Sequence, residues 1–382
     1  MNKTKALFLS LTLWIGGIGN AYADFEMNLV RGVTKISQAN YDLHMLIIWI
    51  CTIIAVVVYG VMFYSIVNHR KSKGAVAAQF HESTKVEIIW TTIPIIILIG
   101  LAIPATKTMI EMDDTSESDM SIKITGYQWK WRYEYLDEGI DFMSSLDALS
   151  NAARQRDSDV DPTTVPNYLL NVDNPMVVPV NKKIRLLFTA ADVIHSWWVP
   201  ALGWKKDAIP GYITEAWTNI EKPGIYRGQC AELCGKDHGF MPIVVIAKTE
   251  AQYAEWVAQQ KTAAQEKAGE ADREWTQDEL ITRGEEVYNG NCASCHQAGG
   301  EGVPGTFPAI KGSAVAMGDL EKHIDVVLNG AGTMMPGFSS MLPADDLAAV
   351  ITFQRNALGN NVGDSVQPSA IKPLLGDEDE DE

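Results

Sequence analysis

Two long apolar stretches constrain the fold of this chain more than any other feature. They run from about residue 45 to 67 and from about 86 to 105, and each is close to the ~20 residues that a helix needs to cross a bilayer. Backbone polar groups find no water at that depth, so a spanning segment has to be helical or part of a closed barrel. The sequence therefore predicts a hairpin of two membrane helices surrounded by lipid.

The charges beside these stretches predict how the hairpin is oriented. The loop between them is basic, with Arg70, Lys71, Lys73 and Lys85, and the segment after the second stretch is acidic, with Glu111, Asp113, Asp114, Glu117 and Asp119. Loops rich in lysine and arginine stay on the cytoplasmic side. We therefore expect a multi-pass protein of a bacterial inner (cytoplasmic) membrane, with both termini and everything from about Met112 onward in the periplasm.

The N-terminal residues have the pattern of a secretory signal peptide. Two lysines precede an apolar run over residues 6–18, and Ala21-Tyr22-Ala23 follows. This order predicts cleavage before Asp24. A short retained membrane anchor is the alternative.

The twelve residues from Cys230 to Met241, Cys-Ala-Glu-Leu-Cys-Gly-Lys-Asp-His-Gly-Phe-Met, combine two cysteines, a histidine and a methionine. Thiolate, imidazole and thioether ligands favour copper over magnesium or calcium, and a weak methionine ligand is typical of electron-transfer copper. A disulfide between Cys230 and Cys234 is the alternative in an oxidising compartment, but a disulfide requires neither His238 nor Met241. The motif therefore predicts electron transfer rather than hydrolysis.

Segments of alternating polarity predict a sheet-rich frame around this motif. Residues 121–125, 183–188 and 242–247 show the pattern of strands. His195 follows one of these strands, and the loop that starts at Cys230 precedes another. End loops of a β-sandwich bring ligands that are distant in sequence to one place. We therefore expect His195 to join the copper motif.

The second cysteine pair lies in Cys292-Ala-Ser-Cys-His296. This is the attachment signature of a c-type haem, in which both thiols bind the porphyrin and His296 is an axial iron ligand. A disulfide or a thioredoxin-like pair is the alternative, although neither requires a histidine directly after the second cysteine.

A sixth iron ligand is expected from a methionine, which raises the potential of the haem. Met335 is the preferred candidate because it precedes a proline in the glycine-rich segment 332–338, and its neighbour Met334 is the rival. Met317 and Met341 are expected to be packing residues. His323 lies in a helical pattern and is expected to be an ordinary surface or hydrogen-bonded histidine.

The rest of the chain divides around these two motifs. Helices are predicted over 278–288 and 344–356, flanking the haem signature and the methionine loop, and Phe307-Pro308 is expected to turn beside the haem. The segment between the two redox modules, rich in Ala, Gln, Glu and Lys, predicts a helical or flexible tether. Residues 137–167 are predicted to form a long loop of no assigned function, and the acidic end of the chain is predicted to be disordered.

Four segments carry a close resemblance to subunit II of the haem-copper cytochrome c oxidases. They are Gly126-Tyr-Gln-Trp-Lys-Trp-Arg-Tyr-Glu-Tyr135, Val172-Asp-Asn-Pro-Met-Val-Val-Pro179, Asp192-Val-Ile-His-Ser-Trp-Trp-Val-Pro-Ala-Leu-Gly203, and Cys230 to Met241. The resemblance implies a two-helix membrane hairpin and an all-β cupredoxin-like Greek-key sandwich. The haem signature adds an all-α class I cytochrome c domain.

The resulting division of the chain is as follows. It has a signal peptide (1–23), an N-terminal segment with two membrane helices (24–111), a binuclear copper domain (112–250), a linker (251–274), a cytochrome c domain (275–358) and an acidic disordered tail (359–382).

The resemblance also implies roles for individual residues. The thiolates of Cys230 and Cys234 bridge two coppers, and the remaining copper ligands are His195, His238, Met241 and the carbonyl of Glu232. The Glu232 side chain faces a magnesium ion shared with subunit I. Trp129 carries electrons in from a donor, whereas Trp131 and Tyr135 are expected in the core. Glu87 is a mouth for proton uptake, with a solvated helix end as the alternative.

The sequence thus predicts an electron-input subunit that passes electrons from a cytochrome c donor through haem c and copper to subunit I, where oxygen is reduced to water and protons are pumped. Subunit III is a further expected partner. The net charge of −17 argues against nucleic acid as a partner and favours a basic protein.

Two alternatives remain, one from the same redox class and one from another functional class. One is an electron-delivery subunit of another respiratory reductase, and the other is a quinol oxidase subunit whose sandwich is purely structural. The membrane helices and Glu87 argue against the first. The presence of Cys230, Cys234 and His238 argues against the second.

Overall fold

A computed structural model describes residues 28–77, 79, 81–155, 158–271, 273–332, 335–339 and 341–375. The predicted signal peptide and Met334 lie outside these residues. The chain divides into two compact units, one containing Ser37–Ala105 and the other containing Val33–Ile36 and the chain from Thr106 onward.

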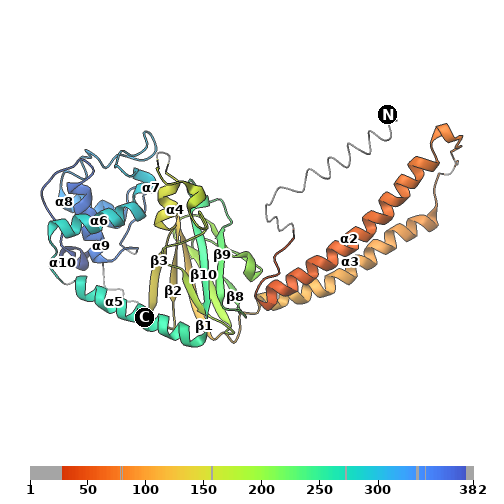
Figure 1. The fold of residues 1–382 in the computed structure, drawn as a ribbon, viewed down its shortest axis with the longest axis horizontal. Helices are drawn as coiled ribbons and strands as arrows, with labels where there is room; N and C mark the ends of the chain where they lie inside the picture. Colours follow the sequence, from red (N-terminus) through yellow and green to blue (C-terminus); the bar gives the residue numbers. More distant parts are fainter. Residues whose placement is uncertain are drawn as a thin grey trace. The chain divides into compact units, whose positions relative to one another are not determined.

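The first unit is a helical hairpin, as predicted. Helix α2 (Lys35–Asn68) and helix α3 (Thr84–Asp113) extend the two apolar stretches at both ends, and the short helix η2 (Lys71–Lys73) lies in the basic loop between them (Figure 1). Their apolar side chains are exposed; the side chain of Phe63, for example, is 64% exposed. Such a surface is stable in lipid but not in water.

The second unit contains a β-sandwich (Figure 1). One sheet has the order β3 (Ile140–Ser144), β2 (Lys130–Tyr135), β1 (Met120–Tyr127), β5 (Ile184–Ala190) and β8 (Thr214–Thr218). The other has the order β4 (Met176–Pro179), β10 (Pro242–Lys248), β9 (Gly224–Cys230), β6 (His195–Trp198) and β7 (Lys205–Ala208). The pairs β1–β5 and β10–β4 are parallel, and the other strand pairs are antiparallel. The three predicted strands correspond to β1, β5 and β10.

The sandwich core follows from the alternation of its strands. Every second residue of β5 is buried, from Ile184 to Ala190, because successive side chains of a strand point to opposite faces. Trp131 and Trp197 are the largest fully buried side chains of this core. Helix α5 (Glu250–Ala271) follows β10 and buries Trp256 in the same core. The expected tether is therefore helical, and its first part packs on the sandwich instead of moving freely.

The chain after α5 forms a helical module. It contains α6 (Gln277–Asn291), α7 (Ala293–His296), α8 (Leu320–Asn329), α9 (Ala344–Asn356), α10 (Pro368–Ile371) and η6 (Lys372–Leu374). A capping box of Thr276 and Glu279 starts α6. Helices α6 and α9 approach closely at Gly284, where an added Cβ would lie 2.2 Å from the carbonyl oxygen of Ala349. Both predicted helices are confirmed.

The prediction of a disordered tail is wrong for residues 359–375. Val366 and Ile371 are buried in the core of the helical module, and Arg355 of α9 donates hydrogen bonds to the Asp364 carboxylate. The run of acidic residues that led to this prediction occupies only positions 377–382, and residues 376–382 lie outside the described residues. The prediction of a loop over 137–167 is also wrong in part, because this segment contains β3, helix α4 (Ala148–Ala153) and the short helix η3 (Pro162–Thr164).

Candidate copper and haem sites

The candidate copper ligands lie at one end of the sandwich. His195 is the first residue of β6, Cys230 is the last residue of β9, and the two strands are antiparallel neighbours with Trp197 opposite Cys230. The loop after Cys230 carries Cys234 and the short helix η5 (His238–Phe240) before β10 begins. Two strand ends and one loop therefore position the predicted ligands.

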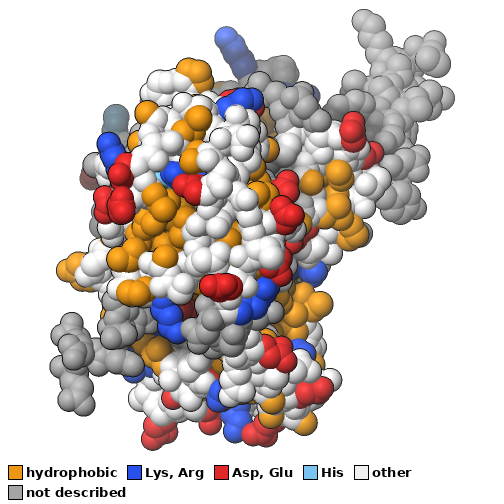
Figure 2. All heavy atoms as spheres, turned by 90° about the vertical axis from the view of Figure 1, so that its left-hand side faces the viewer, with side chains coloured by type: hydrophobic (Ala, Val, Ile, Leu, Met, Phe, Trp, Pro, Cys, Tyr) orange, Lys and Arg blue, Asp and Glu red, His pale blue; other side chains and the backbone are white. Residues whose placement is uncertain are grey.

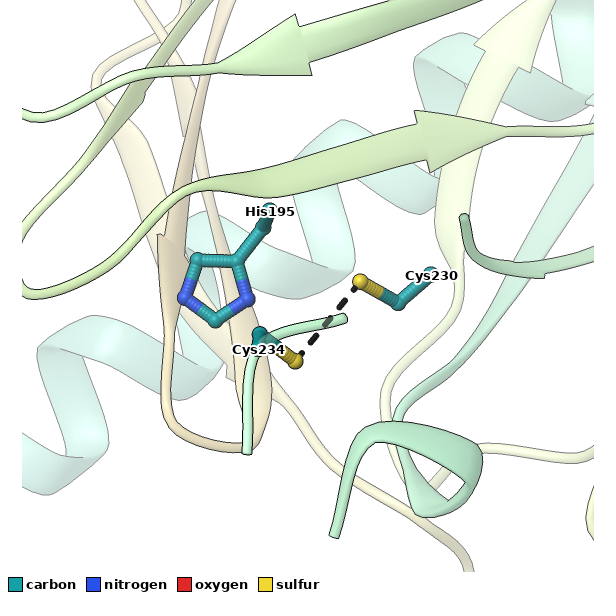
Figure 3. Close-up of side chains that lie close together, drawn as sticks. All are labelled: His195, Cys230 and Cys234. Atoms are coloured by element: carbon teal, nitrogen blue, oxygen red, sulfur yellow. Dashed lines mark hydrogen bonds between the residues drawn. The ribbon is translucent and has the colours of Figure 1, made fainter. Parts of the chain in front are cut away.

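Three of these side chains point toward one another (Figure 3). The His195 ring nitrogen and the sulfurs of Cys230 and Cys234 lie within 4.8 Å of each other, and all three residues are buried. The two sulfurs are 3.9 Å apart, well beyond the ~2.05 Å of a disulfide. The disulfide alternative is therefore not what the structure shows at this pair.

The hydrogen bonds of His195 leave one ring nitrogen free for a metal. Its Nε2 lies 2.8 Å from a carboxylate oxygen of Asp192, whereas its buried Nδ1 has no hydrogen-bond partner among the described residues. A carboxylate on one ring nitrogen commonly orients the other toward a metal. Gly126 provides the space for this ring, because an added Cβ there would lie 2.7 Å from His195 Cδ2.

The remaining predicted ligands gather around the same sulfurs. Cys234 Sγ lies 3.6 Å from His238 Nδ1 and 3.5 Å from Met241 Sδ. Cys230 Sγ lies 3.4 Å from the carbonyl oxygen of Glu232. The side chain of Glu232 is exposed. The structure thus brings together all six residues that the sequence predicted, and their soft donor set fits copper.

The two thiols are electrostatically coupled. The hydrogen bond from the Cys234 thiol, and to a lesser extent the nearby His195 ring, lower the pKa of Cys230 to about 3 despite its burial. The pKa of Cys234 is raised by the hydrogen bond between its thiol and Cys230, and burial and the repulsion between two adjacent thiolates act in the same direction. In the absence of a cation one proton therefore stays on the pair, and a bound metal would replace it.

The aromatic strand residues divide as predicted. Trp129 is half-buried, and its Nε1 lies 3.3 Å from the carbonyl oxygen of Cys234, to which Gln128 Nε2 also donates at 2.7 Å. Trp131 and Tyr135 are buried in the core. Trp129 lies in the turn between β1 and β2 and contacts the copper loop.

Sequence reasoning missed a contact that stabilises the copper loop. Arg154, directly after α4, donates to the buried Asp237 carboxylate at 3.3 Å and lies 4.4 Å from the ring centre of Phe240. Both partners belong to the copper loop. Arg154 and Asp237 are 83 positions apart, and no periodicity or motif links residues at that separation. The segment 137–167 thus has a structural role beside the copper ligands.

The residues of the haem signature are also arranged so that they can bind a cofactor. His296 Nδ1 lies 2.8 Å from the carbonyl oxygen of Pro308, and this bond leaves Nε2 available to an iron. Cys292 and Cys295 are half-buried and unbridged. Burial raises the pKa of Cys292 to about 12, so this thiol is not a reactive thiolate. These residues fit covalent haem attachment.

Several apolar side chains that pack against the core of the helical module remain partly uncovered. They are Cys292, Ala293, Leu320, Met335 and Leu342. Figure 2, which views the side drawn on the left of Figure 1, shows hydrophobic side chains gathered on one part of that face. A flat apolar porphyrin would bury such a surface.

The structure describes most of the other candidate iron ligands. Met335 is half-buried against the helical core, and Met334 is outside the described residues. Met341 is a core residue, as predicted, but Met317 is 45% exposed, so the prediction that it packs is wrong. His323 is buried and its Nε2 lies 2.8 Å from Gln354 Oε1, so it is the hydrogen-bonded histidine that the pattern suggested.

Glu87 lies in the first turn of α3 and is exposed. This is the helix end where the sequence placed it.

Comparison with known proteins covers all three modules. The family profile described as cytochrome c oxidase subunit II, periplasmic domain, matches residues 120–248, and the profile of the transmembrane domain of that subunit matches residues 23–108. A third, described as cytochrome c oxidase, cbb3-type, subunit III, matches residues 279–353. A probable cytochrome c oxidase subunit 2 of Rickettsia bellii is 37% identical over 241 residues, which are 63% of this chain and 86% of the relative. The chain belongs to the cytochrome c oxidase subunit II family.

Two further proteins are similar to part of this cytochrome c oxidase subunit II. The subunit 2 of Cereibacter sphaeroides is 38% identical over 223 residues, covering 56% of this chain and 73% of the relative. The solved periplasmic domain of subunit II of Bradyrhizobium japonicum is 43% identical, covers 39% of this chain and 98% of that chain, and has a TM-score of 0.34. The matches to the family profiles and to the Rickettsia bellii relative make the protein a subunit of a cytochrome c oxidase, with a membrane hairpin, a periplasmic domain and an additional cytochrome c domain.

Proposed function

We propose that this subunit is the electron input of its oxidase. Electrons from a cytochrome c donor enter at haem c, pass to a binuclear copper centre and continue to subunit I, where oxygen is reduced to water with proton pumping. The proposed haem ligands are Cys292, Cys295, His296 and Met335, and the proposed copper ligands are His195, Cys230, Glu232, Cys234, His238 and Met241. Both groups supply one-electron storage, so no bond has to be made in this chain.

The single observation that carries the copper assignment is the free Nδ1 of His195. A buried polar atom without a partner is costly, and here it lies beside two unbridged thiols. Asp192 fixes the ring from the opposite side. A purely structural sandwich, as in the quinol oxidase alternative, would gain nothing from this arrangement.

Exposed apolar loops beside the copper site support a partner subunit. Val193 and Ile194 precede His195, Leu233 precedes Cys234, and all three are exposed. An apolar surface of this kind indicates an interface. We assign it to subunit I, with subunit III as a further partner, and we assign the exposed carboxylate of Glu232 to a magnesium ion in that interface, since magnesium prefers oxygen ligands.

Two further roles belong to the same proposal. Trp129 would conduct electrons into the copper loop, which its Nε1 contacts at the Cys234 carbonyl. Glu87 would serve proton uptake at the cytoplasmic end of α3, where an ionisable group near membrane depth is often functional.

The experiment is a spectrum and a metal analysis of the oxidase purified with its membrane partners. We expect haem c bands, a near-infrared copper band and two coppers in this subunit. His195→Asn should remove the near-infrared band while leaving the haem c bands, and His69→Asn, at an exposed loop position, should change neither. Haem c without copper in the unaltered protein would indicate a cytochrome on a structural scaffold and would refute the proposal.

A further inference from the structure

The copper loop and the haem signature are in direct contact. Lys236 lies between the copper ligands Cys234 and His238, and its Nζ donates a 2.7 Å hydrogen bond to the carbonyl oxygen of Ser294. Ser294 lies between the two haem cysteines. The same ammonium group lies 6.0 Å from the ring centre of Phe307.

A second lysine of the sandwich reaches the same segment. Lys130, the first residue of β2, is only 5% exposed. Its Nζ donates a 2.5 Å hydrogen bond to Asn291 Oδ1, at the end of α6, and lies 5.7 Å from the ring centre of Phe338. Asn291 Nδ2 in turn donates to the Val287 carbonyl. The amide is thereby fixed with its oxygen toward the lysine.

Apolar contact accompanies the two lysines. Tyr127, the last residue of β1, is 8% exposed and belongs to the hydrophobic core of the helical module. Met143 of β3 packs against that core as well. A buried lysine needs an acceptor, because an unpaired buried charge is strongly unfavourable. The only hydrogen bond from Lys130 Nζ within the described residues ends on the other module.

We propose that Lys130 and Lys236 are docking residues that hold the haem signature directly on the copper loop, so that the cytochrome module delivers electrons from a fixed position and not by moving on a tether. This inference rests on the proposed function. The transfer moves one electron from the haem group to the copper pair, which oxidises the first and reduces the second. No proton or bond has to change.

Docking has a consequence for the external donor. Lys236 of the copper loop contacts Ser294 of the haem signature. A docked cytochrome module therefore occupies part of the surface through which a soluble protein would otherwise reach the copper. The donor is expected to reduce the haem module, not the copper.

The test uses variants of the full chain, purified with its oxidase partners. Asn291→Ala removes the acceptor and leaves the Lys130 amine buried without a partner, and Lys236→Ala removes the second bond. A hydrogen bond to a charged group is worth roughly a tenfold change in an equilibrium. We therefore expect each variant to accelerate amide hydrogen exchange in residues 292–297 by about tenfold and to slow electron transfer from photoreduced haem c to copper by a similar factor.

Two further variants make the result specific. Lys130→Met added to Asn291→Ala should restore both readouts, because an apolar side chain can be buried without an acceptor. Lys222→Ala is the matched control, since Lys222 is exposed and precedes β9 at the end opposite to Cys230. If Asn291→Ala disturbs haem attachment, the exchange and electron-transfer rates of Lys236→Ala, at an exposed position, test the docking without it.

The proposal is overturned if Asn291→Ala and Lys236→Ala leave both exchange and transfer unchanged while copper and haem bands are normal. It is also overturned for Lys130 if Lys130→Met does not restore docking. Failure of the proposed function would look different, because the unaltered protein would then lack the near-infrared copper band.

Discussion

Arg154→Gln should weaken the copper loop although Arg154 is not a copper ligand. Its partner Asp237 has a side chain that is only 5% exposed, at 3.3 Å from the guanidinium. Loss of a hydrogen bond to a charged group costs about 1.5–3 kcal/mol, and loss of the contact with Phe240 adds about 0.5–1 kcal/mol. Because the Arg154 side chain is itself 16% exposed, water replaces part of the loss. We expect a net destabilisation of about 2 kcal/mol.

The assay is thermal unfolding of the copper-loaded full chain, together with copper retention against a chelator. A loss of about 2 kcal/mol corresponds to a fall in Tm of about 4–8 °C. Arg185→Gln is the control, because the Arg185–Glu215 pair is solvent-exposed, at 40% and 36%, and exposed pairs contribute about 0–1 kcal/mol. Asp237→Asn added to Arg154→Gln should recover part of the loss. Equal effects of Arg154→Gln and Arg185→Gln would show that the buried Arg154–Asp237 pair does not stabilise the copper loop.

Three further predictions concern other parts of the chain. Gly126→Ala should displace the His195 ring, which an added Cβ would approach to 2.7 Å, and thereby lower copper content; full copper occupancy in that variant would contradict this. Burial lowers the pKa of Lys130 to about 8 from 10.5, with Cys292, Asp173 and Asp192 acting in the opposite direction. The unfolded or undocked state therefore binds more protons between these values, and docking should strengthen as pH rises from about 8 to 10.5. The readout is the protection factor of the amides of residues 292–297, that is, their exchange rate relative to that of an unstructured chain at the same pH, and a protection factor that does not rise would contradict this prediction. Deleting residues 376–382 should leave the Tm of the cytochrome module unchanged and reduce the salt-sensitive rate of association with a basic donor. Deleting residues 359–382 should lower that Tm, because Val366 and Ile371 are buried. An unchanged association rate at low salt would exclude recruitment of the donor by the acidic end.

The sequence was most informative where metal-binding residue types lie close together along the chain. Cys230, Cys234, His238 and Met241 lie within one loop, so their short spacing alone predicted that they meet. His195 was assigned from its position after a predicted strand, and the adjacency of β6 and β9 explains why that was sufficient. The membrane helices followed from hydropathy, since few other segments are apolar for that length.

The contacts that the sequence did not predict and the wrong prediction of a disordered tail have a common physical cause. The contacts between Arg154 and Asp237 and between Lys130 and Asn291 join residues that are 83 and 161 positions apart, and local patterns carry no information on such pairs. The order in residues 359–375 depends on a few apolar side chains that find a core elsewhere. Burial in a distant core, not local composition, decides whether such a segment is ordered.

The most direct test of the electron relay is transient spectroscopy of the purified oxidase after rapid photoreduction of its haem c. With an electron relay through copper, we expect the haem c band to be reoxidised at the rate at which the near-infrared copper band is bleached, and we expect Cys230→Ser to abolish both changes while haem c is still photoreduced. Reoxidation of haem c at an unchanged rate in Cys230→Ser would contradict the relay, because electrons would then leave the cytochrome module without passing through the copper site.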